Sequence, residues 1–397
     1  MDKMTLKDVD IEGKTVLMRV DFNVPIKDGA IGDDNRMVQA LPSINYVIEQ
    51  GGKLVLMSHL GRPGGSVDKS LSLQPVAEHL KTLVDADVNF AEDCIGDTAA
   101  FVISEAGEGD IVLLENVRFH EGEKANDEEF SKQLAAHGDL FCNDAFGSSH
   151  RAHSSVAGVT RYLQPAVSGF LLEKEIKYLD GSVNNPDRPF VAILGGAKVS
   201  DKIGVIENLL GKVDTIIVGG GMTYTFYKAK GWPIGDSLVE DGKVELASEL
   251  MQKADEQGVK FMLPVDSVVA RAFENDAEHK VVDEEGIEDG WMALDIGPQS
   301  AISFGNIIKN ARTVVWNGPM GVFEMENFAD GTNAVAEALA EATQLGATTI
   351  IGGGDSAAAI KQAGLEEQVS HVSTGGGASL MFLEGKDLPG VVALTDK

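Results

Sequence analysis

Short runs of apolar, β-branched residues recur along this chain, each followed by a turn and a segment with helical periodicity. The run Phe190–Leu194 is unbroken and apolar, as expected of a parallel strand that is buried on both faces. The pair Gly195 and Gly196 then permits a sharp turn into a helix expected to begin near Val199. Strands that alternate with helices through short turns are typical of doubly wound, mainly parallel α/β sheets.

The alternation forms two series of elements. In the first series, strands are expected at 15–22, 53–58, 88–90, 111–114 and 139–143, with helices at 37–50, 73–84, 98–106 and 127–137. In the second, strands after Phe190–Leu194 are expected at 215–218, 260–263, 313–316, 348–351 and 371–373, with helices at 199–210, 243–257, 299–310, 327–345, 356–362 and 377–383. An amphipathic helix at 168–180 and a turn at 181–186 separate the two series. We therefore expect two Rossmann-like lobes, 1–167 and 187–383, joined by a helix and linker at 168–186 with a cleft between them.

The composition limits the possible partners. With 397 residues, of which 43% are hydrophobic, the chain is long enough for two or three domains with substantial cores. A net charge of −29 argues against binding to nucleic acid or to an anionic membrane. Neither a transmembrane run nor a signal peptide is apparent, so a cytoplasmic location is expected. Cys94 and Cys142 lack the spacing of a metal or redox motif and are expected to be small buried hydrophobic residues.

Glycine turns follow most strands of the second lobe, and carboxyl ends of parallel strands bind ligands in such sheets. The turns are Gly195-Gly196, Gly219-Gly220-Gly221, Gly297-Pro298, Gly318-Pro319, Gly352-Gly353-Gly354 and Gly375-Gly376-Gly377. Lys198 and Lys202, at i and i+4 on one predicted helix face, would add positive charge beside a helix N-terminus, which attracts phosphate. The segment is neither a Walker A loop nor G-x-G-x-x-G, so a plain turn with two solvated lysines remains the alternative.

Two acidic residues of the second lobe have competing interpretations. Asp355, directly after a glycine turn, suits Mg²⁺ bound to phosphate oxygens, which is the favoured interpretation; the alternative is that it is only the N-cap of the next helix. Glu324 could accept a hydrogen bond from a ribose hydroxyl, although a solvated carboxylate is the simpler interpretation.

The first lobe carries most of the arginines, often just beyond an apolar strand. Arg19, Arg36, Arg62, Arg118, Arg151 and Arg161 precede residue 170, and Arg188, Arg271 and Arg312 follow it. Guanidinium groups suit bidentate recognition of carboxylate and phosphate, so we expect a cleft for a small anion. His150 and His153 could bind metal, but without a third ligand anion contact or structural hydrogen bonding is favoured.

The ordered motifs of the chain closely resemble those of bacterial phosphoglycerate kinases over essentially the whole length. They are RVDFNVP (19–25), SHLGRP (58–63), ENVRF (115–119), DAFGSSHRAHSS (144–155), LGGAKVSDKI (194–203), GGGM (219–222), WNGPMGVFE (316–324), GGGDS (352–356) and STGGGASL (373–380). The resemblance implies a cytoplasmic, monomeric glycolytic enzyme that transfers a phosphoryl group between 1,3-bisphosphoglycerate and ADP with Mg²⁺. It also implies that the tail 384–397 packs on the first lobe.

The resemblance assigns roles to individual residues. It implies a phosphoglycerate site made of Asp21, Phe22, Asn23, Arg36, His59, Leu60, Gly61, Arg62, Arg118 and Arg151. It implies a nucleotide site made of Gly195, Gly196, Lys198, Lys202, Gly219, Gly220, Asn317, Glu324, Gly353, Gly354, Asp355 and Ser356, with Asp355 at the metal. Glu175 and His371 are implied to form an interdomain pair. The family commonly has Thr at Ser356 and Ile or Val at Met37, which leaves only fine affinity in doubt because Ser keeps the hydroxyl and its capping ability.

The chemistry of this reaction needs no general base, because the attacking carboxylate is already ionised at neutral pH. We expect Arg36 and Lys198 to flank the transferring group with Lys202 assisting, and closure of the lobes to exclude water. A dehydrogenase would need G-x-G-x-x-G after a strand, and a two-lobed solute-binding protein would normally carry an export signal. Both features are missing from this sequence.

Overall fold

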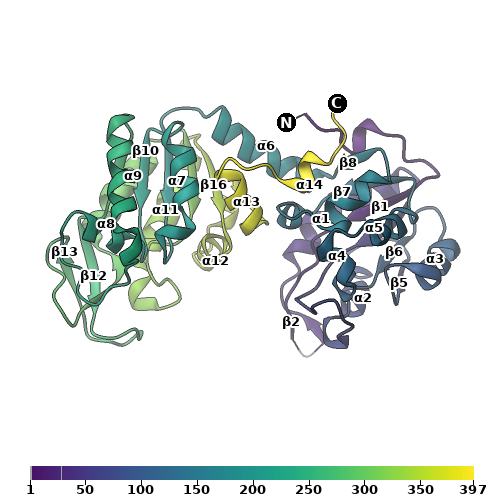
Figure 1. Cartoon of the computed structure of the whole chain (residues 1–397), viewed down its shortest axis with the longest axis horizontal. Coiled ribbons are helices and arrows are strands. Elements are labelled where there is room, and N and C mark those ends of the chain that lie inside the picture. The colour runs from purple at the N-terminus through teal and green to yellow at the C-terminus, as the bar shows by residue number, and fades with distance from the viewer. Residues whose placement is uncertain (1, 28) are drawn as a thin grey trace. The chain divides into compact units, whose positions relative to one another are not determined.

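The computed structural model describes residues 2–27 and 29–397, which divide into two compact units (Figure 1). Unit 1 runs to Lys177 and also contains Asp387–Lys397, and unit 2 is Tyr178–Lys386. Each unit is built around one six-stranded sheet. Among the described residues, no helix is long and apolar enough to cross a membrane.

The sheet of unit 1 is entirely parallel, in the order β5-β6-β4-β1-β7-β8. Its strands are β1 (Thr15–Arg19), β4 (Lys53–Met57), β5 (Val88–Ala91), β6 (Ile111–Leu114), β7 (Leu140–Asn143) and β8 (Ala166–Ser168). The helices are α1 (Asn35–Glu49), α2 (Gln74–Leu80), α3 (Gly96–Glu105), α4 (Glu121–Ala125), α5 (Glu128–Ala135), α6 (Phe170–Asn184), which continues into unit 2, and α14 (Pro389–Val392). A short hairpin joins β2 (Ile26–Lys27) to β3 (Ala30–Ile31).

The central strands of the unit 1 sheet are buried on both faces, which explains their apolar runs, whereas the edge strand β5 exposes Asn89. Val16 and Met18 of β1 pack with Ile44 of α1 in one hydrophobic core. The alternate residues Leu17 and Val55 point to the opposite face and are equally buried, at 0% exposure. Consecutive residues of such a central strand are therefore mostly apolar, and the buried Arg19 at the end of β1 is an exception.

The sheet of unit 2 is also parallel, in the order β11-β10-β9-β15-β16-β17. Its strands are β9 (Phe190–Leu194), β10 (Thr215–Val218), β11 (Lys260–Met262), β15 (Thr313–Asn317), β16 (Thr348–Gly352) and β17 (His371–Val372). The helices are α7 (Ile203–Leu210), α8 (Thr223–Ala229), α9 (Val244–Glu256), α10 (Pro298–Lys309), α11 (Asp330–Gln344), α12 (Gly354–Gln362) and α13 (Gly376–Leu383). Two mainly parallel α/β units are thus confirmed.

A three-stranded antiparallel sheet was not anticipated from the sequence. Its strands are β12 (Asp266–Ala270), β13 (His279–Asp283) and β14 (Met292–Ile296), in the order β13-β12-β14. Figure 1 shows it beside α8 in unit 2, where Tyr227 and Trp291 belong to one apolar cluster.

Three local expectations were wrong. The helix expected at Val199 starts instead as a 3₁₀ turn, Val199–Asp201, and α7 begins at Ile203. The turn expected at 181–186 is helical to Asn184, because buried Ser182 and Val183 anchor the last turn of α6. The first strand ends at Arg19 rather than at residue 22.

The carboxyl-terminal segment completes unit 1. Lys3 and Asp396 form an antiparallel bridge, and the Nδ2 of buried Asn143 donates to the carbonyl of Gly390 at 2.9 Å. A Cβ on Gly390 would lie 2.9 Å from Ser149 Cα, so α14 approaches the backbone closely. The segments that begin at Asp2 and end at Lys397 are therefore both part of unit 1 (Figure 1).

Candidate active site

A buried arginine lies at the carboxyl end of the central strand of unit 1. Arg19 ends β1 and is 1% exposed. Its Nη2 is 3.0 Å from His59 Nδ1, and its Nε donates to Ser155 Oγ at 2.8 Å. Ser155 Oγ in turn donates at 2.7 Å to Glu123 Oε1, a carboxylate with no exposed surface. Glu123 thus supplies counter-charge to Arg19 through one hydroxyl.

The predicted residues at 21–23 meet Arg36. This arginine lies in the first turn of α1, its Nη1 is 3.4 Å from Asp21 Oδ1, and it donates to the carbonyl of Asn23 at 3.2 Å. The Oδ1 of Asn23 accepts from the backbone N–H of Gly61 at 2.9 Å. Phe22 is buried below them, and its N–H donates to Ser58 Oγ at 2.9 Å. The loops after β1 and β4 are thereby joined.

Arg118 and Gly61 lie next to the residues just described, because Asn23 also contacts Gly61. Arg118 lies in the 3₁₀ turn Val117–Phe119, and its Nη1 donates to the carbonyl of Gly61 at 2.8 Å. Gly61 has φ +61°, and an added Cβ would lie 2.7 Å from Leu71 Cδ2, so glycine is required there. Leu60 is buried, whereas Arg62 is exposed. The Nε of Arg118 is buried without a hydrogen-bond partner among the described residues, and such a donor suits an anionic ligand.

The electrostatics of this region are strongly positive. Burial, followed by the charges of Arg19, Arg118, Arg151 and Arg36, holds the pKa of His59 well below its usual range. Burial, with Arg19 and Arg151, also lowers the pKa of Arg118 to about 10. Since neighbouring cations disfavour each other, a bound phosphate or carboxylate would relieve their repulsion.

The same arginine charges act on His153, and they lead to a prediction of how stability depends on pH. Burial, then Arg118, Arg151 and Arg19, lowers its pKa from 6.5 to about 4. Between these pH values the unfolded chain binds a proton that the folded chain does not. The free energy of unfolding should therefore fall as the pH drops from 6.5 to 4. In urea unfolding, His153→Gln should show a shallower pH slope in this window, and equal slopes would contradict the assignment.

The glycine turns of unit 2 lie packed against one another after β9, β10 and β15. A Cβ on Gly195 would lie 2.1 Å from the carbonyl oxygen of Pro319, and one on Gly220 would lie 2.6 Å from the nitrogen of Gly196. A Cβ on Gly219 would meet Met320 Sδ at 2.4 Å. These distances leave no room for any side chain, so the backbones approach as a phosphate cradle requires.

A cavity of about 490 Å³ adjoins these turns. Among the predicted residues, it is lined by Gly196, Gly220, Glu324 and Asp355. Its other walls include Tyr224, Leu238, Phe273 and 292–294, the last from the unanticipated antiparallel sheet. Largely apolar walls with glycine backbone and the carboxylates of Asp236, Glu324 and Asp355 suit a planar base linked to a polar, phosphate-bearing group.

The remaining predicted nucleotide residues lie around Asn317. Lys202 Nζ donates to Asn317 Oδ1, and burial lowers the pKa of Lys202 although Asp201, Asp355 and Glu384 oppose the shift. The Nδ2 of Asn317 is buried without a hydrogen-bond partner. Lys198 is exposed, and it and Lys202 flank the 3₁₀ turn rather than sharing a helix face, which corrects the expectation.

The turn before α12 also differs from expectation. Gly353, with φ +92°, is the N-cap residue, so exposed Asp355 lies in the first turn after Gly354 rather than at the cap. Ser356 was expected to retain a capping role, but its Oγ accepts from the N–H of Gly318 at 2.6 Å. Its hydroxyl therefore joins the turns after β15 and β16.

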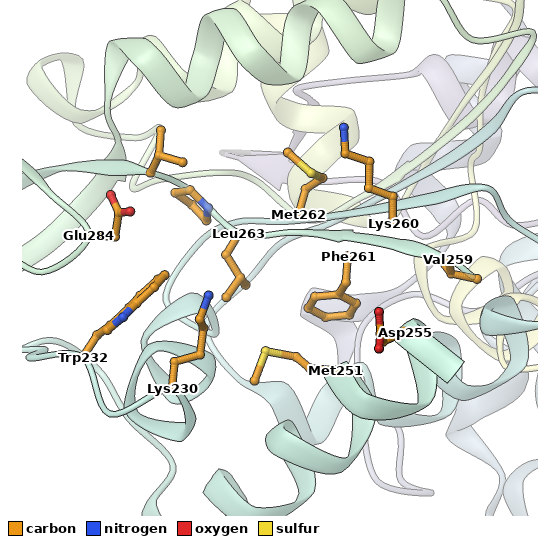
Figure 2. Close-up of a pocket in the computed structure, with 12 residues that line it drawn as sticks. Lys230, Trp232, Met251, Asp255, Val259, Lys260, Phe261, Met262, Leu263 and Glu284 are labelled. Carbon is orange, nitrogen blue, oxygen red and sulfur yellow. The ribbon is translucent and has the colours of Figure 1, made fainter. Parts of the chain in front are cut away.

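A second cavity in unit 2, of about 580 Å³, contains none of the predicted residues (Figure 2). It lies along the edge strand β11 and is lined by Lys230, Trp232, Met251, Asp255, 259–265 and Glu284. No glycine lines it, so it lacks the close backbone approach found beside Gly220.

The two residues implied to form an interdomain pair fall in different units. Glu175 is buried in α6 of unit 1, and His371 begins β17 of unit 2. The His371 ring stacks on Tyr178, with centroids 4.7 Å apart. Their pairing stays a prediction.

Ser155, Glu123 and the apolar wall residues were not predicted as site residues, and Arg19 was predicted only as one of the arginines of an anion cleft, without a role of its own. The signal for Arg19 was available, since a charged residue inside a buried strand needs a partner. No sequence signal links Arg19 to Glu123, which is far along the chain.

Two parallel α/β units, one with a cluster of arginines at its strand ends and the other with glycine turns beside a base-sized cavity, define a two-unit phosphotransferase. Residues 6–386 match the sequence profile of phosphoglycerate kinase. Phosphoglycerate kinases of Chloroherpeton thalassium and Clostridium novyi are 59% and 55% identical, each aligned over 100% of both chains. The solved phosphoglycerate kinase of Coxiella burnetii has a TM-score of 0.90 at 41% identity, covering 98% of each chain.

The chain therefore belongs to the phosphoglycerate kinase family. It is a kinase of glycolysis that binds ATP, and it transfers a phosphoryl group with a carboxyl group as acceptor.

Proposed function

We propose that this chain performs reversible, Mg²⁺-dependent transfer from 1,3-bisphosphoglycerate to ADP, with phosphoglycerate held by unit 1 and nucleotide by unit 2. The observation that carries the assignment of unit 1 is the concentration of arginines around neutral His59, which includes the unpartnered Nε of Arg118. A phosphoglycerate ligand carries up to three negative charges, two on its phosphate and one on its carboxylate, and these would offset the positive charge of the arginines. Arg62, exposed beyond Gly61, is free to extend toward a ligand phosphate.

The proposed mechanism is in-line transfer without a general base. In the direction of ATP use, the ionised carboxylate of 3-phosphoglycerate attacks the γ-phosphorus, the bond to the β-γ bridging oxygen breaks, and ADP leaves. No proton needs to be removed from the nucleophile. His59 is a poor candidate for a base in any case, because Arg19 Nη2 lies against its Nδ1, and because burial and the neighbouring arginines lower its pKa and so make it a weak base.

Three cations would stabilise the group in transfer. Arg36, with a side chain 38% exposed, and exposed Lys198 are the candidates for its equatorial oxygens. Lys202 would exchange its hydrogen bond to Asn317 for a phosphate oxygen. The buried, unpartnered Nδ2 of Asn317 can donate to phosphate at the same time.

The residues of unit 2 fit a magnesium ion. Asp355 offers an exposed carboxylate at the edge of the cavity, and Mg²⁺ typically takes one or two carboxylates with phosphate and water oxygens. Bound there, the ion would neutralise charge on the nucleotide phosphates.

We further propose that the enzyme works as a cytoplasmic monomer whose units close on their substrates. Since each unit holds one substrate in this proposal, transfer requires the two to meet and to exclude water from the acyl phosphate. Glu175 and His371 would couple the units. Small-angle scattering should show a smaller radius of gyration with both 3-phosphoglycerate and MgATP than with either alone. An unchanged radius would contradict closure.

The direct test is ATP consumption with 3-phosphoglycerate and Mg²⁺, coupled to removal of the acyl phosphate. Turnover should require all three components. It should stop when glycerate replaces 3-phosphoglycerate, and it should stop when EDTA is added. Absence of turnover in a folded preparation would refute the proposal.

A further inference from the structure

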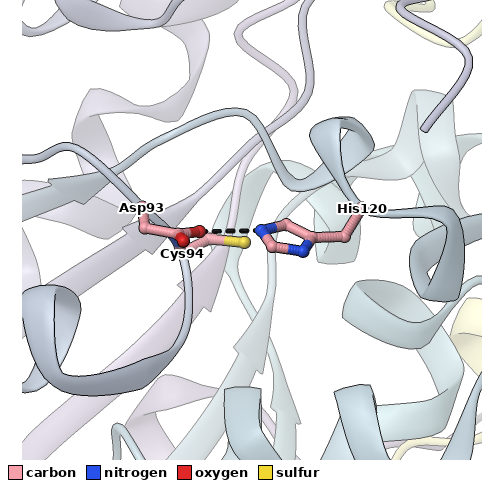
Figure 3. A group of neighbouring side chains, drawn as sticks. All are labelled: Asp93, Cys94 and His120. Atoms are coloured by element: carbon pink, nitrogen blue, oxygen red, sulfur yellow. Dashed lines mark hydrogen bonds and ion pairs between the residues drawn. The ribbon is translucent and has the colours of Figure 1, made fainter. Parts of the chain in front are cut away.

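Three side chains with different ligand atoms meet in unit 1 outside the proposed substrate groups (Figure 3). Asp93 and Cys94 follow β5, and His120 follows the 3₁₀ turn after β6. Because β5 and β6 are adjacent parallel strands, their carboxyl ends bring the two loops together. A carboxylate oxygen, the thiol sulfur and a ring nitrogen all lie within 4.8 Å of one another.

The cluster is held by contacts on several sides. His120 Nε2 lies 2.7 Å from Asp93 Oδ1, which also accepts from the N–H of Cys94 at 2.7 Å. The His120 ring packs on Phe130, with centroids 5.2 Å apart. Asp93 and His120 are partly exposed, whereas Cys94 is buried. The group is therefore ordered, and two of its three members are accessible from solvent.

The orientation argues against a nucleophilic triad. A triad places the thiol and the carboxylate at opposite ring nitrogens, so that the imidazole passes a proton between them. Figure 3 shows the Cys94 thiol and the Asp93 carboxylate directed to the same edge of the His120 ring. Ligand atoms that converge on one point are the arrangement of a metal site instead.

We propose that Asp93, Cys94 and His120 bind a borderline-soft divalent cation of the zinc type, with water as the fourth ligand. Sulfur, imidazole nitrogen and carboxylate oxygen together suit Zn²⁺ and disfavour Mg²⁺, which takes oxygen ligands. On binding, the thiol proton passes to solvent, and the proton that His120 Nε2 donates to Asp93 leaves that nitrogen, so that the neutral imidazole carries one proton, on Nδ1. The metal then replaces the hydrogen bond between Asp93 and His120. Tetrahedral bond lengths are about 2.0–2.3 Å, so the ligand atoms, now within 4.8 Å of one another, would move closer together on binding.

Charge at the cluster also favours a cation. The Asp93 carboxylate lies among the three ligand atoms, 2.7 Å from His120 Nε2, and a divalent ion bound there would stabilise the Cys94 thiolate. This site is independent of the phosphoryl-transfer assignment, because none of its three ligands belongs to the proposed substrate groups.

The test uses the full chain with Zn²⁺ or Co²⁺ alone. Competition with a chromogenic chelator should show one tight Zn²⁺ site, and Co²⁺ should give the absorption of a cobalt–thiolate bond. Cys94→Ser should abolish that absorption and weaken Zn²⁺ binding about 100-fold or more, since removing groups behind a ligand already costs 10- to 100-fold. His120→Ala, at a partly exposed position, should weaken Zn²⁺ binding similarly and serves if Cys94→Ser does not fold.

Two variants provide matched controls. Cys142→Ser removes the other buried thiol, and His79→Ala breaks a His–Asp pair of 2.9 Å, with Asp34, that is not part of such a cluster. Both should keep the cobalt–thiolate absorption and the Zn²⁺ affinity. The proposal is overturned if the parent chain gives no such absorption, or if Cys142→Ser removes it and Cys94→Ser does not.

Discussion

Replacing Arg36 with alanine is expected to lower the turnover number about 100-fold or more, as loss of a preorganised charged donor does. Within residues 2–27 and 29–397, the guanidinium makes an ion-pair contact with Asp21 and one hydrogen bond to the carbonyl of Asn23, which leaves donors for a ligand. Partly exposed ion pairs contribute about 1 kcal/mol or less to stability, so the fold should tolerate the change. The loss should therefore appear in kcat at saturating substrates, with an unchanged melting temperature.

Matched variants separate catalysis from simple loss of charge. Arg36→Lys keeps the charge without the planar fork and should recover only part of the turnover. Arg161→Ala removes an exposed arginine of the same unit and should leave turnover unchanged. Lys198→Ala in unit 2 should resemble Arg36→Ala, because both cations are proposed to contact the group in transfer. Near-normal turnover in Arg36→Ala would remove it from the mechanism.

The parallel architecture could be predicted from the sequence because each central strand is buried on both faces. Such strands consist of consecutive apolar residues, as in β9, and need no knowledge of their neighbours. The antiparallel sheet of β12, β13 and β14 could not be predicted in this way, because its strands are not all runs of consecutive apolar residues. β13 is largely exposed and carries His279, Lys280 and Asp283, so its strand conformation depends on pairing with β12.

The predicted ends of two helices were wrong for a different physical reason. Gly181 and Asn184 have weak helix propensity and suggested a turn, yet burial of Val183 at 2% exposure keeps them helical. At Val199 the error was the opposite one, because an α-helix was expected where the chain forms a 3₁₀ turn. The 3₁₀ turn there positions Lys202 toward Asn317, a contact between residues 115 positions apart that no local pattern encodes.

The types of site residue were predictable, but their connections were not. Glycines and arginines at strand ends indicated anion binding because parallel topology collects those ends. The pairing of Arg19 with Ser155 spans 136 positions, and Glu123 reaches Arg19 only through that hydroxyl. Cys94 shows the same limit, since its relation to His120 appears only when β5 and β6 lie side by side.

Replacing Gly318 with alanine is expected to destabilise unit 2 by several kcal/mol, on the order of 3–5, and to abolish nucleotide binding. Gly318 has φ +105°, and an added Cβ would lie 2.2 Å from the carbonyl oxygen of Gly195 and 2.4 Å from its carbonyl carbon. These are backbone atoms, fixed because Gly195 N–H donates to the carbonyl of Asn317 at 3.0 Å. A side chain can be accommodated only if the turns after β9 and β15 separate.

Gly211→Ala is the matched control for this prediction. Gly211 lies in the same unit at the end of α7, with φ −81° and nothing within 4 Å of an added Cβ. Alanine there should change stability by less than about 1 kcal/mol, in the stabilising direction, by restricting the unfolded chain. Thermal unfolding and calorimetric titration with MgADP would compare the two variants. The contrary result is that Gly318→Ala unfolds at the same temperature as Gly211→Ala and binds MgADP with normal affinity. That result would show that the close packing of these turns does not shape the nucleotide site.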